Sequence, residues 1–529
     1  MTYRGLLKPV VTTVGHVIDP TNMFSRLSDY GRKPHSLLFE SKYIVPKYGE
    51  QSIGVGEPCL RVRGAGGLFE ITALNETGER FVGHLSGDFD FAEDVDYGRL
   101  SISGSLRPER KAVSEDERLR LKTHADVLRI VAFKFTPAYK PMSTYGELLR
   151  TYGGLFGGIS YDFIDQYEDL PPPRSNVLKD PDYLMYFADN LFVVDHKHSR
   201  THLVSNALIA GEKESVAVDE ARNKLRRLEN AMYGEKPKPR MFKPKKGTVA
   251  TDMPREEYER LVTVMREHIM AGDVFQAVLA RKIIADYNAE PLDIYRELRM
   301  MNPSPYMFFV NNGSDGILLG ASPEMAVRVY DGEVEIRPIA GTRPRGFVNG
   351  LIDKNKDEAL ETELKTDAKE LAEHMMLVDL ARNDVAQVSV PGTRTVDELC
   401  TVEKYSHVQH LVSNVRGKLK PGLDCLHAYV ATMNMGTLTG APKVMAMRLL
   451  REHEPGKRGF YGGSVGYITP SGDMDTAIVI RSMELKGGKA YVSAGAGIVY
   501  DSDPAIEFNE TESKAKAPLT AIQKAGGIL

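Results

Sequence analysis

A single proline-rich, basic stretch interrupts the sequence of 529 residues and constrains how the chain divides into folded parts. The stretch runs from Gly234 to Gly247 and holds three prolines among lysines and an arginine, a composition typical of an exposed connector. The segment on either side is long enough to bury a core of its own. We therefore predict an N-terminal domain of residues 1–233, a linker of residues 234–250 and a C-terminal domain of residues 251–529.

The spacing of apolar residues after this stretch predicts a helix followed by a buried strand. Apolar side chains recur at helical intervals over residues 258–269, and Gly272 suits the end of that helix. Residues 274–280 are too short and too continuously apolar for a second helix, so we predict a buried strand that carries Gln276. Upstream, residues 127–135 also have the composition of a strand.

Two strand-like runs near the end of the chain predict a β-hairpin. They cover residues 476–484 and 489–499 and are joined across Gly487 and Gly488, a pair that favours the tight turn of a hairpin. Helices alternate with such strands, and the predicted fold is therefore α+β, built around antiparallel sheet.

Composition excludes several classes of protein. The net charge of -4, from 68 Lys+Arg and 72 Asp+Glu, provides no basic field that would attract nucleic acid. The start of the chain lacks the apolar core of a signal peptide, and no apolar run approaches the roughly 18 residues that cross a bilayer, so we expect a cytoplasmic protein with no membrane partner. Cys59, Cys400 and Cys425 are scattered singly and predict neither a metal motif nor a disulfide framework.

Two pairs of glutamates share one spacing. Glu370 and Glu373 stand three residues apart on a probable helix capped by Asp367, and Glu507 and Glu510 repeat the spacing near the end of the chain. Each pair would project from one side of its helix. Solvated helix faces have the same spacing, so the pattern alone leaves both a functional and a structural explanation open.

Three further segments have the composition of ligand-binding loops. Residues 434–443 combine two glycines with hydroxyl and amide groups ahead of an apolar helix, as in a loop that holds an anion. Residues 495–497 read Gly-Ala-Gly, which permits close approach of a ligand to the backbone. Residues 336–345 combine a Gly-Thr turn with three arginines, as a carboxylate-binding site would. Ordinary turns explain each segment equally well when it is taken alone.

The order of these segments resembles that of the chorismate-utilising enzymes and, within that group, component I of anthranilate synthase. The resemblance is dense over residues 250–520 and thinner upstream, and it implies a large antiparallel-sheet chorismate-binding fold with helices packed on the sheets. The motifs that carry it are GASPE (320–324), PIAGTRPR (338–345), EHMMLVDLARND (373–384), HVQHLVS (407–413), GTLTGAPK (436–443) and the helix with Glu507, Glu510 and Lys514.

Two positions distinguish among the enzymes of this group. Where isochorismate and salicylate synthases carry a lysine that activates water, this chain has Gln276, and where aminodeoxychorismate synthases carry a nucleophilic lysine, it has Ala340. The resemblance therefore implies attack by ammonia and formation of anthranilate, the first step of tryptophan biosynthesis. The alternatives are an aminodeoxychorismate synthase component I, a relative that stops at the aminated intermediate (aminodeoxyisochorismate), and a binding or regulatory protein without catalysis.

The resemblance also implies a cofactor and roles for individual residues. Chorismate is a dianion, so a site lined with glutamates needs a cation, and Mg²⁺ with oxygen ligands fits that need. Glu373 and Glu510 are the expected principal ligands, with Glu370 and Glu507 acting directly or through waters. The expected chorismate-binding residues are Gly341, Thr342, Tyr461, Arg481, Gly495, Ala496, Gly497 and Lys514.

Four residues are expected to take part in the chemistry. Glu324 is the candidate general acid that protonates the departing hydroxyl, and His410 is assigned to the second step. Thr437 is a candidate hydrogen-bonding group, and Gln276 lies at the position that selects the nucleophile. A histidine satisfied by its neighbours in a strand is the ordinary alternative for His410.

Two expectations concern partners. None of the three cysteines has the small flanking residues of a nucleophile elbow, so ammonia is expected from a separate glutamine amidotransferase subunit, in a heterodimer or a heterotetramer. The resemblance further implies allosteric feedback inhibition by L-tryptophan. The expected inhibitor-binding residues are Glu40, Ser41, Pro305, Tyr306 and Met307.

Overall fold

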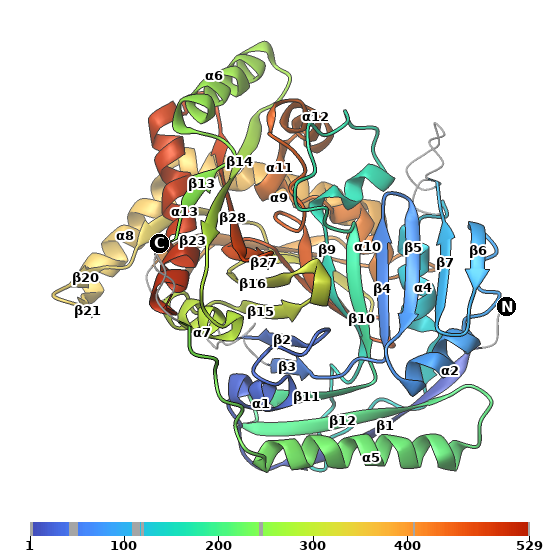
Figure 1. Ribbon diagram of the computed structural model, residues 1–529. Coiled ribbons are helices and arrows are strands. Elements are labelled where there is room, and N and C mark those ends of the chain that lie inside the picture. The colour runs from blue at the N-terminus through green and yellow to red at the C-terminus, as the bar shows by residue number, and fades with distance from the viewer. Residues whose placement is uncertain are drawn as a thin grey trace.

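The computed structural model describes residues 4–41, 51–107, 117, 121–242, 247–405 and 408–526. Within these residues the chain forms two large sheets with helices packed on them (Figure 1). Neighbouring strands are antiparallel, except that β1 (Gly5–Val14) and β8 (Phe135–Pro137) run parallel. The expected α+β class built on antiparallel sheet is confirmed.

The first sheet begins at a strand that overlaps the end of the predicted linker, and it ends at the N-terminal strand and its parallel neighbour. Its described strands, in spatial order, are β13 (Val249–Thr251), β14 (Gln276–Asp286), β28 (Lys489–Ile498), β27 (Ser482–Lys486), β16 (Ile317–Ser322), β15 (Tyr306–Asn311), β2 (Leu37–Glu40), β3 (Gln51–Val55), β11 (Asn190–Asp195), β12 (Arg200–Ile209), β1 and β8, with β24 (Gly440–Ala441) paired to β14.

The second sheet, like the first, contains strands from both halves of the chain. Its described strands, in spatial order, are β19 (Ile339–Pro344), β23 (Val408–Lys418), β18 (Glu333–Ile336), β17 (Met325–Tyr330), β26 (Met474–Ile478), β25 (Ser464–Ile468), β9 (Gly154–Ile159), β10 (Tyr183–Ala188), β4 (Leu60–Ala65), β5 (Leu68–Ala73), β7 (Ser101–Ser105) and β6 (Glu93–Tyr97), with β22 (Thr395–Lys404) paired to β23. A separate hairpin joins β20 (Phe347–Val348) to β21 (Leu351–Ile352).

Both sheets continue across the predicted domain boundary. In the first sheet β15 pairs with β2, which places Met307 opposite Glu40, and in the second sheet β25 pairs with β9. The largest buried cluster lies between the sheets and draws residues from both halves, such as Val62 and Val327. Because the two halves share both sheets, the strands do not separate residues 1–233 from residues 251–529. The division into two domains stays a prediction. Residues 243–246 of the predicted linker lie outside the described residues.

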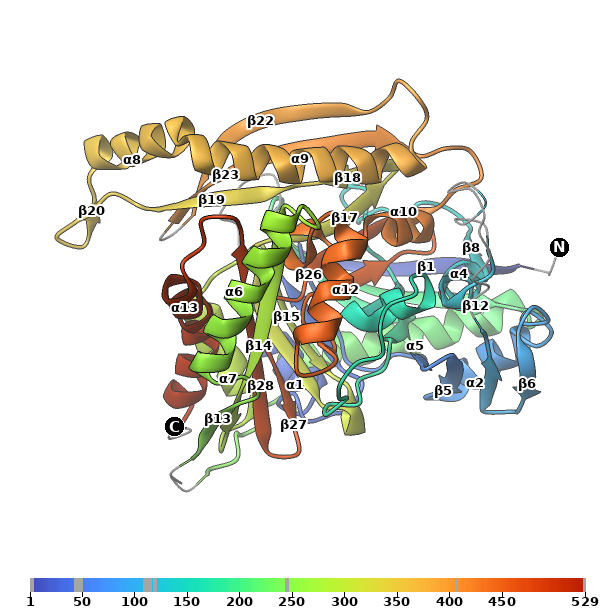
Figure 2. The ribbon, with the colours of Figure 1, turned by 90° about the horizontal axis from the view of Figure 1, so that it is seen from above.

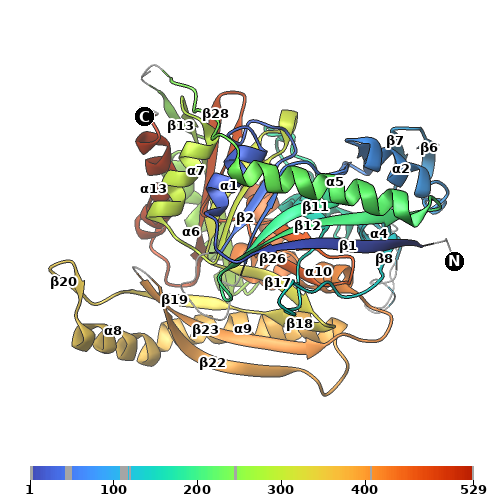
Figure 3. The ribbon, with the colours of Figure 1, turned by 90° about the horizontal axis from the view of Figure 1, so that it is seen from below.

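Helices cover the outer faces of the sheets. Figure 3 shows α5 lying along β1 and β12, and Figure 2 shows α9 beside β22 and β23. The described α-helices are α1 (Pro20–Leu27), α2 (Glu76–His84), α4 (His124–Phe133), α5 (Glu214–Tyr233), α6 (Arg255–Ala271), α7 (Pro291–Met301), α8 (Lys354–Thr366), α9 (Ala368–Val388), α10 (Cys425–Thr432), α11 (Gly436–Thr439), α12 (Lys443–His453) and α13 (Pro504–Lys524).

The predicted helix, the strand at Gln276 and the hairpin turn are confirmed, but two predicted strands are wrong. α6 ends at Gly272 in the left-handed conformation (φ 84°), β14 begins at Gln276, and the β27–β28 hairpin turns at two glycines with positive φ. Residues 476–484 do not form one strand, because they include the end of β26 in the second sheet and the start of β27 in the first. Residues 127–135 were expected to form a strand, but most of them lie in α4. Val127, Leu128, Val131 and Ala132 occupy one buried helical face, and a capping box between Thr123 and Asp126 starts the helix.

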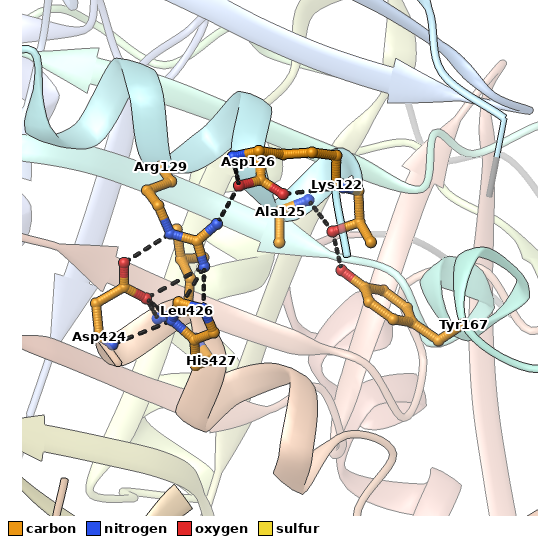
Figure 4. Close-up of polar contacts among 9 residues, drawn as sticks. Lys122, Ala125, Asp126, Arg129, Tyr167, Asp424, Leu426 and His427 are labelled. Atoms are coloured by element: carbon orange, nitrogen blue, oxygen red, sulfur yellow. Dashed lines mark hydrogen bonds and ion pairs between the residues drawn. The ribbon is translucent and has the colours of Figure 1, made fainter. Parts of the chain in front are cut away.

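A cluster of charged side chains joins the two halves of the chain at α4 and α10 (Figure 4). Arg129 donates to Asp126 on its own helix at 2.6 Å and to Asp424, the N-cap of α10, at 2.6 Å. His427 Nδ1 lies 2.7 Å from the same Asp424 carboxylate. Since α10 leads into α11, this cluster anchors the segment that delivers Thr437 to the site.

Candidate active site and a second cavity

The start of α9 presents the first pair of glutamates. Asp367 accepts hydrogen bonds from the backbone N–H groups of Lys369 and Glu370, which begins the helix where the sequence predicts. Glu370 accepts from Arg343 Nη1 at 2.9 Å, so a protein cation already engages it. Burial raises the pKa of Glu373, and the negative charges of Glu370 and Glu510 raise it further.

The start of α13 presents the second pair. Glu507 accepts from the Ser502 hydroxyl at 2.7 Å, and Glu510 pairs with Lys514 Nζ at 2.6 Å. Burial raises the pKa of Glu507. Of the four predicted glutamates, Glu373 and Glu510 come from different helices and interact across the gap between them, which makes them the pair best placed to share a cation.

The donor set fits a hard cation held by few protein ligands. Within the described residues, no group of three or more His, Cys, Asp or Glu side chains lies close enough to hold a metal ion. Two carboxylates on separate helices nevertheless suit Mg²⁺, which keeps several waters and takes further oxygens from its substrate. Burial and the repulsion from Glu370 and Glu510 raise the pKa of Glu373, and a cation bound beside its carboxylate would offset both effects.

Gln276 lies beside this carboxylate pair. Its side chain is buried, and Nε2 donates to Glu373 Oε1 at 3.4 Å. Its Oε1 has no hydrogen-bond partner among the described residues. Gly497 faces the same amide, since a Cβ at that position would come within 2.4 Å of Nε2. Glycine at 497 therefore leaves room for Gln276 to point into the site.

A cationic wall lies on the β28 side of the site. Lys514 donates from Nζ to the carbonyl of Gly495 at 2.9 Å, and Arg481 donates from Nη1 to the carbonyl of Lys514 at 3.4 Å. Arg481 has φ of 51°, a left-handed backbone that is uncommon for a non-glycine residue. Burial lowers the pKa of Arg481 and raises that of Tyr461 to about 12. Together these groups can bind a carboxylate.

His410 and the Gly341–Thr342 segment of β19 form another wall. His410 lies on β23 opposite Thr342 of β19, and its Nδ1 is 2.9 Å from the Thr342 hydroxyl and 3.1 Å from the Gly341 carbonyl. Because a carbonyl only accepts, Nδ1 carries the proton and Nε2 is left as a base. Burial lowers the pKa of His410, which favours this neutral form. Gly341 has φ of 66°, and a Cβ there would lie 3.0 Å from Glu370.

Glu324 is buried between the sheet and α11. Its side chain is 9% exposed, and burial raises its pKa to about 8, with the Thr437 hydroxyl and the charge of Lys514 partly offsetting the effect. The carboxyl therefore holds its proton at neutral pH. The structure thus places Thr437 beside Glu324, whereas His410 contacts Thr342, the Gly341 carbonyl and the ring of Tyr405.

Two expectations for the loops need correction. The three arginines of residues 336–345 do not form a free carboxylate-binding site, because each is paired with protein carboxylates: Arg337 with Glu403, Arg343 with Glu363, Asp367 and Glu370, and Arg345 with Asp357. The sequence did not show that Arg343 is already paired, because its carboxylate partners come from two later helices. The expected Gly-Thr turn is also wrong, because Gly341 and Thr342 lie within β19, where the pairing with β23 shifts register.

A second cavity of about 110 Å³ lies between the two sheets, and all five predicted inhibitor-site residues line it. Glu40 is buried and accepts from the Tyr295 hydroxyl at 2.5 Å, and it pairs with Arg299 at 3.0 Å. The sequence reasoning missed the wall from the second sheet, because those residues are distant in the chain. That wall includes Arg328, Tyr467 and Asp475.

Comparisons with known proteins decide the family. The model of the chorismate binding enzyme family matches residues 101–520. The chain belongs to this family. It is 39% identical over 526 residues to anthranilate synthase component 1 of Vibrio parahaemolyticus, covering 98% of this chain and 94% of that protein. It is 41% identical over 496 residues to the pyocyanine-specific anthranilate synthase component 1 of Pseudomonas aeruginosa, covering 92% and 90%.

A solved structure agrees with these relatives. The crystal structure of anthranilate synthase component I from Streptococcus pneumoniae superposes with a TM-score of 0.67 at 31% identity, covering 89% of this chain and 92% of that one. This chorismate-binding protein is therefore an enzyme of the anthranilate synthase component I type. Among its described residues, no helix is both long and apolar enough to pass through a lipid bilayer.

Proposed function

We propose that this enzyme converts chorismate and ammonia into anthranilate and pyruvate in a magnesium-dependent reaction, as the first step of tryptophan biosynthesis. The observation that carries the proposal is that the cationic wall acts on both candidate groups: the charge of Lys514 lowers the pKa of the protonated Glu324, and the charge of Arg481 lowers that of the neutral His410. Lys514 also pairs with Glu510 of the carboxylate pair. These groups supply an acid, a base, a cation site and a carboxylate-binding surface. That is the set of functions the reaction requires.

Substrate binding divides between the two walls. The pyruvyl carboxylate would be held by Arg481, Lys514, Tyr461 and the backbone of residues 495–497. Gly341 and Thr342 would contact the substrate from the other side. Glu373 and Glu510 would hold Mg²⁺, which when bound supplies the positive charge that lets a dianion approach these glutamates.

In the first step ammonia forms a bond to ring C2, the ring double bonds shift, and the C4–O bond breaks. The new ammonium group then loses a proton to solvent and becomes an amine. Hydroxide is a poor leaving group, so Glu324 donates its proton and the group departs as water. Gln276 cannot act as a base toward water and Ala340 cannot attack the ring, which leaves ammonia as the nucleophile. Thr437, beside the Glu324 carboxyl, orients it toward the departing oxygen.

The second step removes a proton and pyruvate from the aminated ring. His410 has Nε2 available to accept the C2 proton, because Nδ1 donates to the Gly341 carbonyl. The C2–H electrons then form a ring double bond, the enolpyruvyl C–O bond breaks, and aromatisation drives the elimination. This makes the enzyme a lyase.

Ammonia is proposed to come from a separate glutamine amidotransferase subunit. The designation of the relatives as component 1 implies a second component. In this chain Cys59 and Cys425 are buried, and burial raises the pKa of both thiols and of Cys400, which opposes formation of a nucleophilic thiolate.

L-Tryptophan is the proposed ligand of the second cavity. The cavity offers apolar surface from Pro305 and Met307 for an indole ring. The ammonium and carboxylate would lie against ion pairs of the lining, in which Glu40 is paired with Arg299 and Arg328 with Asp475. Inhibition would be allosteric, since these residues take no part in the proposed chemistry.

The enzymatic alternative is a reaction that ends at the aminated intermediate or at aminodeoxychorismate. The pyocyanine-specific relative shows that proteins of this similarity include one named for a more specialised purpose. Incubation of the purified chain with chorismate, MgCl₂ and ammonium chloride tests the proposal. Anthranilate fluorescence that rises with ammonium and disappears with chelator supports it. Chorismate consumption without anthranilate would overturn it.

A further inference from the structure

A buried arginine that takes no part in the proposed chemistry lies behind the active site. Arg458 and its ion-pair partner Glu454 are each 5% exposed. The guanidinium donates to Glu454 from Nε at 2.8 Å and from Nη2 at 2.5 Å. Glu454 Oε1 also accepts from the backbone N–H of Ala280 in β14, at 3.0 Å. The pair is therefore bound to a strand of the site as well as to itself.

The other hydrogen bonds of this guanidinium reach two elements that carry candidate active-site residues. Nη1 donates to the carbonyl of Leu438 in α11 at 2.6 Å, and Nη2 donates to the carbonyl of Val278 in β14 at 2.7 Å. Leu438 follows Thr437 directly, and Val278 lies two residues after Gln276. The Arg458 side chain is thus hydrogen-bonded both to α11, which supports the general acid Glu324, and to β14, which carries Gln276.

The flat faces of the guanidinium contact aromatic rings. Its central carbon lies 4.5 Å from the ring centre of Tyr161 and 5.9 Å from that of Tyr461. Tyr461 belongs to the proposed carboxylate-binding wall. A guanidinium can stack on a ring while its edge donates hydrogen bonds, so the same group fixes the position of a third element.

We infer that Arg458 is a positioning residue, which holds α11, β14 and the Tyr461 ring in the arrangement that the reaction needs. Its planar fork of donors satisfies several acceptors at once, whereas a lysine ammonium is a single point charge. Displacement of a reacting group by about 1 Å can lower a rate by about 100-fold. This inference rests on the proposed function and adds to it a residue that touches neither substrate nor cation.

Three variants of the full-length chain separate positioning from stability. Arg458→Gln removes the charge and the fork, and Arg458→Lys keeps the charge for Glu454 but not the fork. The control is Lys134→Gln, which also leaves a buried carboxylate, that of Asp88, without its partner. Lys134 is the C-cap of α4, and Figures 1 and 2 show α4 apart from β14. Each variant is assayed for melting temperature and for ammonia-dependent kcat and KM across pH.

Arg458→Gln and Lys134→Gln are expected to lower the melting temperature to a similar extent, but only the former should lower kcat, by about 100-fold. Arg458→Lys should restore most of the melting temperature and little of kcat. Because the Thr437 hydroxyl lowers the pKa of Glu324, release of α11 should also move the alkaline limb of the pH profile to higher pH.

Parental kcat and an unchanged pH profile in Arg458→Lys would overturn the inference, and so would an equal loss of kcat in Lys134→Gln. An inactive parent chain would instead count against the proposed function, so the two failures are distinguishable.

Discussion

Glu324 and Glu373 are both buried carboxyl groups with raised pKa values, but the causes differ. Burial alone raises the pKa of Glu324, to about 8, while Glu373 is also repelled by Glu370 and Glu510. A lone buried carboxyl responds by keeping its proton, and a repelled cluster responds by binding a cation. Under the proposed function, this difference matches acid chemistry at Glu324 and cation binding at Glu373.

The pH dependence of the reaction follows from this assignment. A general acid works only while it is protonated, so kcat/KM for chorismate should be highest below pH 8 and fall as pH rises through about 8, the pKa of Glu324. Free ammonia must be held constant, because ammonium itself deprotonates in the alkaline range. Glu324→Gln should lower kcat about 100-fold or more and abolish this limb. A limb that persists in the variant would assign it to another group.

A separate prediction concerns the cation at the carboxylate pair of Glu373 and Glu510. Glu510→Gln should raise the Mg²⁺ concentration needed for half-maximal activity and lower kcat severely, with little change in melting temperature, since a partly exposed carboxylate contributes little to stability. Calorimetry should show weaker Mg²⁺ binding. The matched control is Glu512→Gln on the same helix, which should keep the parent's Mg²⁺ dependence. Equal responses of the two variants would contradict the assignment.

At the scale of elements, helical spacing predicted the glutamate pairs because α9 and α13 start at capping aspartates that the sequence displays. The strand at Gln276 was predicted from its continuous apolar run. α4 was not predicted, because a nine-residue apolar run suits a strand or a buried helix equally, and the capping box that decides lies before the run. Partners contributed from other elements, such as Arg343 on Glu370, have no local signature.

The charge cluster between α4 and α10 predicts a pH-dependent contribution to stability. Burial would raise the pKa of Asp424, but the contacts with His427 and Arg129 outweigh it and hold the pKa well below the usual range. Asp424→Asn should therefore lower the free energy of unfolding by about 2 kcal/mol at pH 7. This stability is present above the unfolded-state pKa, about 3.9, and is lost as pH falls toward the lower folded-state pKa.

Denaturant unfolding of Asp424→Asn and the parent at pH 7 and near pH 3 measures this difference. Lys122→Gln, which removes an exposed member of the same cluster, should change stability little. A difference between Asp424→Asn and the parent that grows as pH falls would contradict the account.

At the scale of the whole molecule, the two sheets place both sites on a shared framework. The second cavity lies between β2 and β15 of the first sheet and β17, β25 and β26 of the second. The active site draws on β14 and β28 of the first sheet and on β19 and β23 of the second. A ligand that alters how the sheets face one another can therefore reach both sites. The sequence could not show this arrangement, because it depends on pairings such as β15 with β2 between distant segments.

Tryptophan binding tests this coupling. Ser41→Phe should fill the cavity and relieve inhibition while ammonia-dependent turnover stays near the parent's. Tryptophan should stabilise the parent by about 2.7 kcal/mol at a hundredfold excess over its dissociation constant. Chorismate should weaken tryptophan binding by the same factor that tryptophan weakens chorismate binding. Absence of both inhibition and thermal stabilisation in the parent, or full sensitivity in Ser41→Phe, would count against this ligand.

Identification of the product tests the central claim most directly. The purified chain is incubated with chorismate, MgCl₂ and ¹⁵N-labelled ammonium chloride, and the products are followed by NMR. The account predicts labelled anthranilate and pyruvate in equal amounts, and no product when glutamine replaces ammonium in the absence of a partner subunit. A labelled amino-chorismate that keeps its enolpyruvyl group, or unlabelled isochorismate, would contradict it.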